Sequence, residues 1–134
     1  MSSKLPEIIT EVGFNFSWDE KKVWQLEVAA ERMPINELTW HFEIPFIWSR
    51  PDGYYDVKPI EVIEKPEQYP EEYLRTMNAD TSYPIDVMLW EKRWLILDGL
   101  HRLMKRSIQG DLEVDVRKIH ESMIPLILAD SNEE

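Results

Sequence analysis

The clearest hydrophobic pattern in the chain lies between residues 94 and 110. The apolar run Trp94–Leu97 is too short for a helix and is typical of a buried strand. Asp98 and Gly99 then supply turn chemistry, and Gly110 is a common residue just after a helix. Between them, apolar side chains recur with the spacing of one helical face, at Leu100, Leu103, Met104 and Ile108. The pattern predicts a strand, a tight turn with Asp98 as the helix N-cap, and a helix over residues 100–109.

Neighbouring segments predict further elements. Ile85–Trp90 reads as a strand, and the short charged turn that separates it from Trp94–Leu97 indicates a hairpin. Leu112–Ile119 alternates apolar and polar residues, as a half-buried strand does. Pro66–Asn78 carries apolar residues on one helical face and is predicted to hold a helix.

The first half of the chain and its last residues have weaker patterns. The elements that we expect there are a helical turn capped by Ser17, a strand over 23–29, a strand end and helical turn over 33–38, a packed aromatic loop over 40–48, an edge strand over 57–63 and a short helical turn within 122–128. Pro59 argues against a central position for the 57–63 strand, because proline cannot donate to a sheet ladder. The whole pattern predicts an α+β fold, a compact mixed sheet with short helices.

Length and composition support one domain. A chain of 134 residues with 43% hydrophobic residues can bury one core and is too short for two ordinary domains. We expect a single domain over residues 1–130 and a polar tail over 131–134.

Charge and residue types exclude several classes of function. The formal net charge of −11 makes nonspecific DNA binding unfavourable, because such binding needs a basic face. The chain has no cysteine, which excludes disulfides, thiolate metal sites and thiol chemistry. Its apolar runs are shorter than a membrane span and its first residues lack a signal pattern. We therefore expect a cytoplasmic protein without membrane association.

The predicted junction at residues 98–102 is suited to an anion. A strand that turns directly into a helix leaves backbone N–H groups and the positive end of the helix dipole at one edge of the sheet. In the first turn, His101 is expected to be neutral and able to donate to a phosphate; the alternative is a histidine that only caps backbone groups. Arg102 can bind phosphate through two parallel hydrogen bonds or form a surface salt bridge. Gly99 lets the backbone turn sharply and approach a ligand or its own sheet.

The same residues resemble a known signature. Residues 96–102, Ile-Leu-Asp-Gly-Leu-His-Arg, then Gly110 and Val114–Val116, resemble the Asp-Gly-X-His-Arg signature of the ParB/sulfiredoxin-like superfamily, in which a strand like Pro84–Val87 precedes the signature. The resemblance implies the fold of that superfamily and a nucleotide such as ATP, ADP or CTP at the junction. The binding residues that it implies are Asp98, Gly99, Leu100, His101, Arg102 and Lys105. It also implies Mg²⁺ held by Asp98, although capping of the helix would explain Asp98 equally well.

Departures from the superfamily pattern limit the reactions that the chain is expected to catalyse. Leu100 stands where sulfiredoxins have their nucleophilic cysteine, so sulfiredoxin activity is excluded. Residues 35–43 resemble the loop that carries a His-Glu general base in free-serine kinases of the same fold, with one residue inserted between His41 and Glu43. The expected catalytic residues are therefore His101, and Glu43 or Glu37 as a base for the hydroxyl of a small acceptor. The alternative is that His41 is simply packed among aromatic residues.

Three functions follow from these observations. The first is a nucleotide-dependent phosphotransferase or NTPase, in which positioning and electrostatics supply most of the catalysis. The second is a module without catalysis that binds a protein partner or regulates one. The third is a nuclease, as in the nuclease-like branch of the superfamily, against which the acidic charge argues.

For other polar and aromatic residues we predict only a position in the fold. Asp80 is expected near the anion site, whereas Asp86 is expected to face solvent on the outer side of its strand. Most of the six tryptophans are expected in the core, with Trp40 or Trp48 as a surface aromatic residue.

Overall fold

Residues 12–48 and 55–130 are described by the computed structural model of the chain. One mixed sheet has the strand order β1-β6-β4-β5, formed by β1 (Ala30–Pro34), β4 (Ile85–Trp90), β5 (Arg93–Asp98) and β6 (Glu113–Lys118). A second, small sheet pairs β2 (Ile47–Trp48) with β3 (Tyr55–Val57). The α-helices are α2 (Glu20–Trp24), α3 (Pro59–Glu64), α4 (Pro70–Met77), α5 (Leu100–Ile108) and α6 (Ile124–Ile127), and single 3-10 turns are η1 (Ile35–Glu37), η2 (Thr39–Glu43), η3 (Pro66–Gln68) and η4 (Glu121–Met123).

Strand β4 is central to the larger sheet. It pairs antiparallel with β5 on one side and parallel with β6 on the other. The β4–β5 hairpin turns at Glu91 and Lys92, whose φ angles of 52° and 72° are those of a tight turn that matches strand twist. Helix α5 then carries the chain from β5 across to β6, and β1 pairs antiparallel with the outer side of β6.

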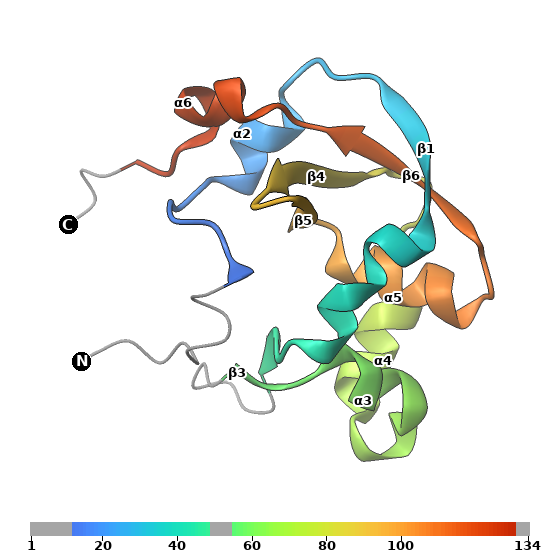
Figure 1. The fold of residues 1–134 in the computed structure, drawn as a ribbon. Helices are drawn as coiled ribbons and strands as arrows, with labels where there is room; N and C mark the ends of the chain where they lie inside the picture. Colours follow the sequence, from blue (N-terminus) through green and yellow to red (C-terminus); the bar gives the residue numbers. More distant parts are fainter. Residues whose placement is uncertain (1–11, 49–54, 131–134) are drawn as a thin grey trace, which may run out of the picture.

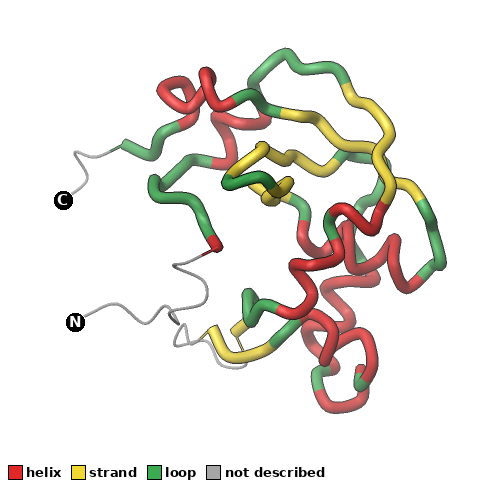
Figure 2. Tube along the Cα trace, viewed as in Figure 1, coloured by secondary structure: helices red, strands yellow, loops and turns green. Residues whose placement is uncertain are grey.

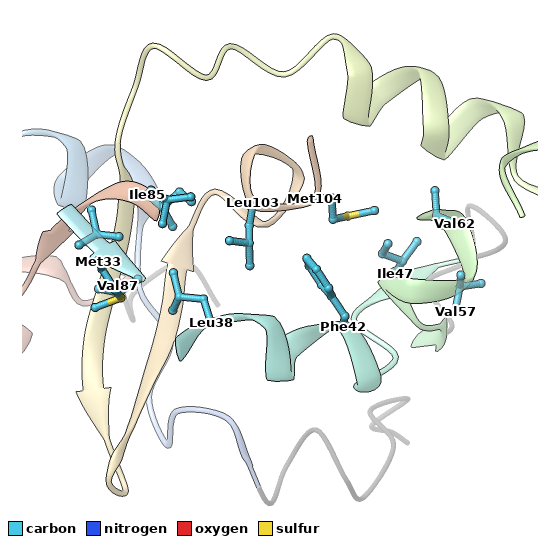
Figure 3. Packing of buried hydrophobic residues seen from close by; sticks show 12 residues of the cluster. Met33, Leu38, Phe42, Ile47, Val57, Val62, Ile85, Val87, Leu103 and Met104 are labelled. Carbon is cyan, nitrogen blue, oxygen red and sulfur yellow. The ribbon is translucent and has the colours of Figure 1, made fainter. Parts of the chain in front are cut away.

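Helices cover both faces of this sheet, as Figures 1 and 2 show: α3, α4 and α5 gather on one side, and α2 and α6 lie on the other. Successive strand residues point to opposite faces. Strand β4 therefore supplies Ile85 and Val87 to one core and Met88 to the other. The first core also holds Met33, Leu38, Phe42, Val62, Leu103 and Met104 (Figure 3). The second is formed by Val23, Leu97, Ile119 and Ile127 with Met88.

The predicted α+β class is confirmed, as are the elements with the strongest patterns. The strand at Ile85–Trp90, the hairpin, the helix after Gly99 and the alternating strand before Ile119 all form. Gly110 follows α5 with a φ of 82°, as expected for the residue just after a helix. The helical turn containing Pro125 is α6. The predicted tail over 131–134 lies outside the described residues.

Three predictions in the first half are wrong. Pro59 is not in a strand but at the first position of α3, where its missing N–H has no helical partner to lose. The predicted strand over 23–29 begins instead at Ala30, because Val23 belongs to the buried face of α2. The N-cap of α2 is Asp19, whose carboxylate accepts from the Lys21 amide at 2.9 Å, rather than Ser17.

Two further predictions are refined. The aromatic segment 40–48 contains η2 and β2 instead of being a loop throughout. The helix predicted for 66–78 is divided into η3 and α4, since Pro70 starts a new helix at its first turn. Among residues 12–48 and 55–130, none of the helices is both long and apolar enough to cross a membrane.

Candidate functional site

A large cleft, about 2020 Å³ in volume, separates α2 and the segment before it from the start of α5. Its walls include Glu20 and Trp24 on one side, and Gly99, His101 and Arg102 on the other. The junction that the sequence singled out therefore opens on a cavity, which the side chains of residues 12–48 and 55–130 do not fill. The cleft carries charged groups of both signs.

Gly99 makes the sharp turn between β5 and α5. Its φ of 120° lies in a region that side-chain-bearing residues rarely adopt, and a Cβ there would lie 3.2 Å from Arg102 Nη1 and from Ile85 Cγ2. Gly99 itself is the N-cap, so the predicted capping role of Asp98 is wrong. Asp98 is still the last residue of β5, and no side chain caps the amides of the first turn of α5. Those amides lack helical acceptors and are available to an anion.

Arg102 is held rigidly at the cleft wall. Its Nη1 donates to the Pro84 carbonyl at 2.6 Å, and its Nη2 donates to Asp98 Oδ2 at 3.2 Å. The side chain is 20% exposed. The guanidinium is thus fixed by Asp98 at the end of β5 and by Pro84 just before β4, which reduces the entropy lost when it binds a ligand.

His101 is paired with a residue of another helix. Its Nε2 lies 3.0 Å from Glu72 Oε1 of α4. An ionised carboxylate only accepts hydrogen bonds, so Nε2 donates and, in the neutral ring, Nδ1 carries the lone pair. A carboxylate that orients an imidazole in this way is a common arrangement for a general base. Lys105, one turn further along α5, donates to the Ala79 carbonyl at 3.0 Å and does not line the cleft.

Asp98 connects the two walls of the cleft. Its Oδ2 accepts from Trp24 Nε1 at 2.7 Å and from Arg102. Within the described part of the chain, Oδ1 accepts no hydrogen bond and remains available to a cation. Groups of three or more potential metal ligands are absent from residues 12–48 and 55–130, so a metal ion here would need ligands from a bound molecule.

Sequence reasoning missed α2 as part of the site. Glu20 lines the cleft, and its pKa is raised by partial burial and then by the nearby Asp98 carboxylate. Trp24, one turn later, is 54% exposed. Trp24 meets its partner Asp98 across 74 residues of sequence, so no local pattern could link α2 to the site.

His41 is a packed residue, which confirms the blander of its two interpretations. Its Nδ1 lies 2.7 Å from the Leu38 carbonyl, and its Nε2 accepts from the Ile96 amide at 3.1 Å. Both nitrogens are therefore used inside the protein. Burial lowers the His41 pKa to about 4, because charging this ring would cost solvation, and the nearby Arg93 charge lowers it further.

The structure does not bring Glu37 and Glu43 together with His101. Both glutamates are exposed on 3-10 turns η1 and η2, and neither lines the cleft. Asp80, in contrast, does line the cleft, and hydrogen bonds from Ser82 lower its pKa.

Asp86 is buried, so its predicted exposure is wrong. It points to the second face of β4, which α2 and α6 cover, and its Oδ1 accepts from Arg117 Nε at 2.6 Å. Arg117 also donates to the carbonyls of Val23 and Leu26 at the end of α2. Desolvation raises the Asp86 pKa despite this pairing.

The tryptophans are less buried than predicted. Trp40 is half-buried, stacked on His41 with ring centroids 4.0 Å apart and covered by the Arg93 guanidinium. Trp24 is the most exposed of the tryptophans whose side chains the structure describes. The side chain of Trp48 lies outside that description.

No family model matches the chain, and no curated protein or solved structure matches it either. The resemblance to the ParB/sulfiredoxin-like superfamily stays a prediction from residues 84–116.

Proposed function

We propose that this chain is a ParB/sulfiredoxin-like domain that binds the phosphates of a nucleotide at the start of α5. The observation that carries the proposal is that Gly99, His101 and Arg102 line one cleft at an uncapped helix N-terminus. Unpaired amides, the helix dipole and a fixed guanidinium together favour phosphate oxygens. ATP, ADP and CTP are the nucleotides to test first.

Mg²⁺ fits this arrangement when the nucleotide supplies part of its coordination. Magnesium is usually bound by one or two carboxylates together with phosphates and water. Asp98 would hold the ion through Oδ1, beside the proposed phosphate site. Bound there, the ion would neutralise phosphate charge.

His101 is the proposed catalytic base for a phosphotransferase or NTPase reaction. Oriented by Glu72, its Nδ1 would take the proton of an attacking water or of the hydroxyl of a small acceptor. The new O–P bond would form at the terminal phosphorus as the bond to the leaving nucleotide breaks. Arg102 would bind the charged oxygens. The cytoplasm is the proposed location of the domain.

Nucleotide binding can be tested by calorimetry and thermal unfolding with ATP, ADP, CTP and GTP in the presence of Mg²⁺. Binding to the folded state raises the melting temperature. R102K keeps the charge but loses the planar fork, and it should weaken binding at least about tenfold. The matched control is R32K, at an arginine that is 63% exposed on the edge strand β1 and does not line the cleft.

Each outcome separates one function from another. A melting temperature that none of the nucleotides changes contradicts the proposal. Nucleotide binding without turnover, in wild type and H101A alike, would favour the regulatory or protein-binding module instead of the enzyme. Nicking of plasmid DNA with Mg²⁺ would favour the nuclease, against the net charge of −11.

A further inference from the structure

Trp24 of α2 presents an indole ring to the cleft. The side chain is 54% exposed, although it belongs to one of the most readily buried aromatic types. Its Nε1 donates to Asp98 Oδ2 at 2.7 Å, so the ring has a fixed orientation. An exposed aromatic ring with a fixed orientation can stack on a flat ligand without losing much conformational entropy.

The helix that carries Trp24 is also anchored. Arg117 Nη2 donates to the Val23 carbonyl at 2.8 Å, and Nη1 donates to the Leu26 carbonyl at 2.7 Å. At the other end of α2, the Asp19 amide donates to the Ile127 carbonyl at 2.9 Å. The exposed ring therefore stands on a short helix that is fixed at both ends.

Trp24 lies close to the proposed phosphate site. The same oxygen of Asp98 accepts from Trp24 Nε1 at 2.7 Å and from Arg102 Nη2 at 3.2 Å. A molecule whose charged oxygens bind at Gly99–Arg102 can therefore reach the indole with a neighbouring flat group. A nucleotide has such a group in its base.

The charges of the cleft differ between its two walls. His101 and Arg102 stand at the α5 wall, whereas Asp19 and Glu20 stand at the α2 wall beside Trp24. Glu20 is four residues before Trp24, so the two side chains share one face of α2. Carboxylates accept hydrogen bonds from the amino groups of adenine, cytosine and guanine, and uracil has no such group.

We propose that Trp24 stacks on the base of the nucleotide and that Glu20 accepts a hydrogen bond from the amino group of that base. This inference rests on the proposed function, because the phosphates must bind at Gly99–Arg102. It assigns base recognition to α2 and phosphate recognition to α5. The preferred ligands are nucleotides with an amino-bearing base.

Calorimetry with ATP, UTP and inorganic triphosphate tests the assignment in the presence of Mg²⁺. Stacking on an aromatic side chain should make ATP bind roughly 5- to 150-fold more tightly than triphosphate. W24L and W24F both remove the hydrogen bond to Asp98, so the comparison between them isolates the aromatic ring. W24L should remove the difference between ATP and triphosphate. W24F should keep most of it, and L112A is the matched control at an exposed apolar residue remote from the cleft lining. E20Q should reduce the preference for ATP over UTP.

The indole N–H signals in proton–nitrogen NMR spectra give a second measurement, which is made on the wild-type protein. W24F assigns the Trp24 signal, which should shift with ATP and much less with triphosphate. Equal affinities of wild type for ATP and triphosphate, with a stationary Trp24 signal, would overturn the base assignment and leave phosphate binding intact. Failure of triphosphate and all nucleotides to bind would overturn the proposed function and this inference together.

Discussion

The two histidines His41 and His101 show how differently the fold uses one residue type. His41 is 2% exposed, and both of its nitrogens have partners inside the protein, Leu38 and Ile96. His101 is 30% exposed at the cleft, and one nitrogen bonds Glu72. The first histidine is a closed polar centre and serves stability. The second is an open polar centre, with one ring nitrogen left for the ligand of the proposed function.

Arginines divide in the same way. Arg117 spends its donors on Asp86, Val23 and Leu26 between the sheet and α2. Within the described residues, Arg102 donates only from Nη1 and Nη2, to a carbonyl and to Asp98, and its side chain is 20% exposed against 12% for Arg117. The comparison teaches that residue type does not identify a functional group; what matters is whether the surrounding fold uses all of its hydrogen-bonding capacity. Changes at closed centres should affect stability first, and changes at the open centre should affect binding first.

The largest expected effect is at the closed Arg117 centre. R117M leaves the Asp86 carboxylate buried without its partner, and such losses cost about 3–5 kcal/mol of unfolding free energy. Two carbonyls at the end of α2 also lose their donors. Urea unfolding of wild type and R117M at neutral pH measures the difference in unfolding free energy.

The control for R117M is R32M on strand β1. Arg32 is 63% exposed and forms ion pairs of 3.5 Å, so this change should cost less than about 1 kcal/mol. Similar losses in the two variants would show that Arg117 is no more important than a surface arginine.

The second effect is a loss of stability in acid at His41. Its pKa falls from 6.5 when unfolded to about 4 when folded, so the unfolded chain binds the proton first. Stability is therefore fully present above pH 6.5 and declines as the pH falls towards 4, by roughly 3 kcal/mol. Chemical unfolding between pH 7 and pH 4 measures the decline.

H41Q isolates the histidine contribution, since glutamine offers an acceptor to the Ile96 amide without titrating. Asp86 acts in the opposite direction: its raised pKa means that the folded chain binds the proton first, so its contribution weakens folding as the pH rises through that range. The loss of unfolding free energy between pH 7 and pH 4 in wild type, minus the loss in H41Q, therefore gives the contribution of His41. Parallel pH profiles for the two proteins would contradict it.

The sequence predicts those helices and strands whose pattern is contained in a short stretch of the chain. The apolar run at Trp94–Leu97, the glycine turn and the helical spacing after it are local, and β5 and α5 form as expected. The predicted edge strand at Pro59 is wrong because proline fits an edge strand and a first helical position equally well. The local pattern does not choose between them.

Long-range partners were beyond sequence reasoning. Asp86 was predicted to be exposed because alternation shows which residues share a face but not whether that face is covered. The covering comes from α2 and α6, at opposite ends of the chain. Asp98, His101 and Arg102 lie in one local segment, so the sequence predicts that they share a site. Trp24 and Glu20 join that site only through the fold, so the sequence does not predict them.

The third effect compares the two glycines that flank α5. Gly99 and Gly110 both have positive φ, of 120° and 82°, so alanine is strained at either. A Cβ at Gly110 meets nothing within 4 Å, and G110A should cost about 1 kcal/mol. A Cβ at Gly99 also crowds Arg102 and Ile85, so G99A should cost roughly 2–3 kcal/mol.

The binding assay separates the two glycine variants further. G99A should weaken nucleotide binding because it displaces the Arg102 guanidinium, and G110A should leave binding unchanged. Thermal unfolding and calorimetry on the same samples give both quantities. Equal losses of stability and of affinity in the two variants would mean that the close approach at Gly99 has no consequence.

The smallest effect on stability is expected at the open centre, where it is accompanied by a large functional effect. E72A removes the partner of His101 Nε2 and should cost less than about 1 kcal/mol, because the pair is partly exposed. On the proposed function, turnover should fall much more than binding, since the imidazole loses its orientation. E72Q, which still offers an acceptor oxygen, should restore part of the rate. R75A is the control for loss of the other charged neighbour of Glu72, because Arg75 also lines the cleft and contacts Glu72 Oε2 at 3.5 Å without touching the histidine bond. If E72A lowers turnover no more than R75A does, the hydrogen bond between Glu72 and His101 does not orient a catalytic base, and the proposed role of the open histidine is contradicted.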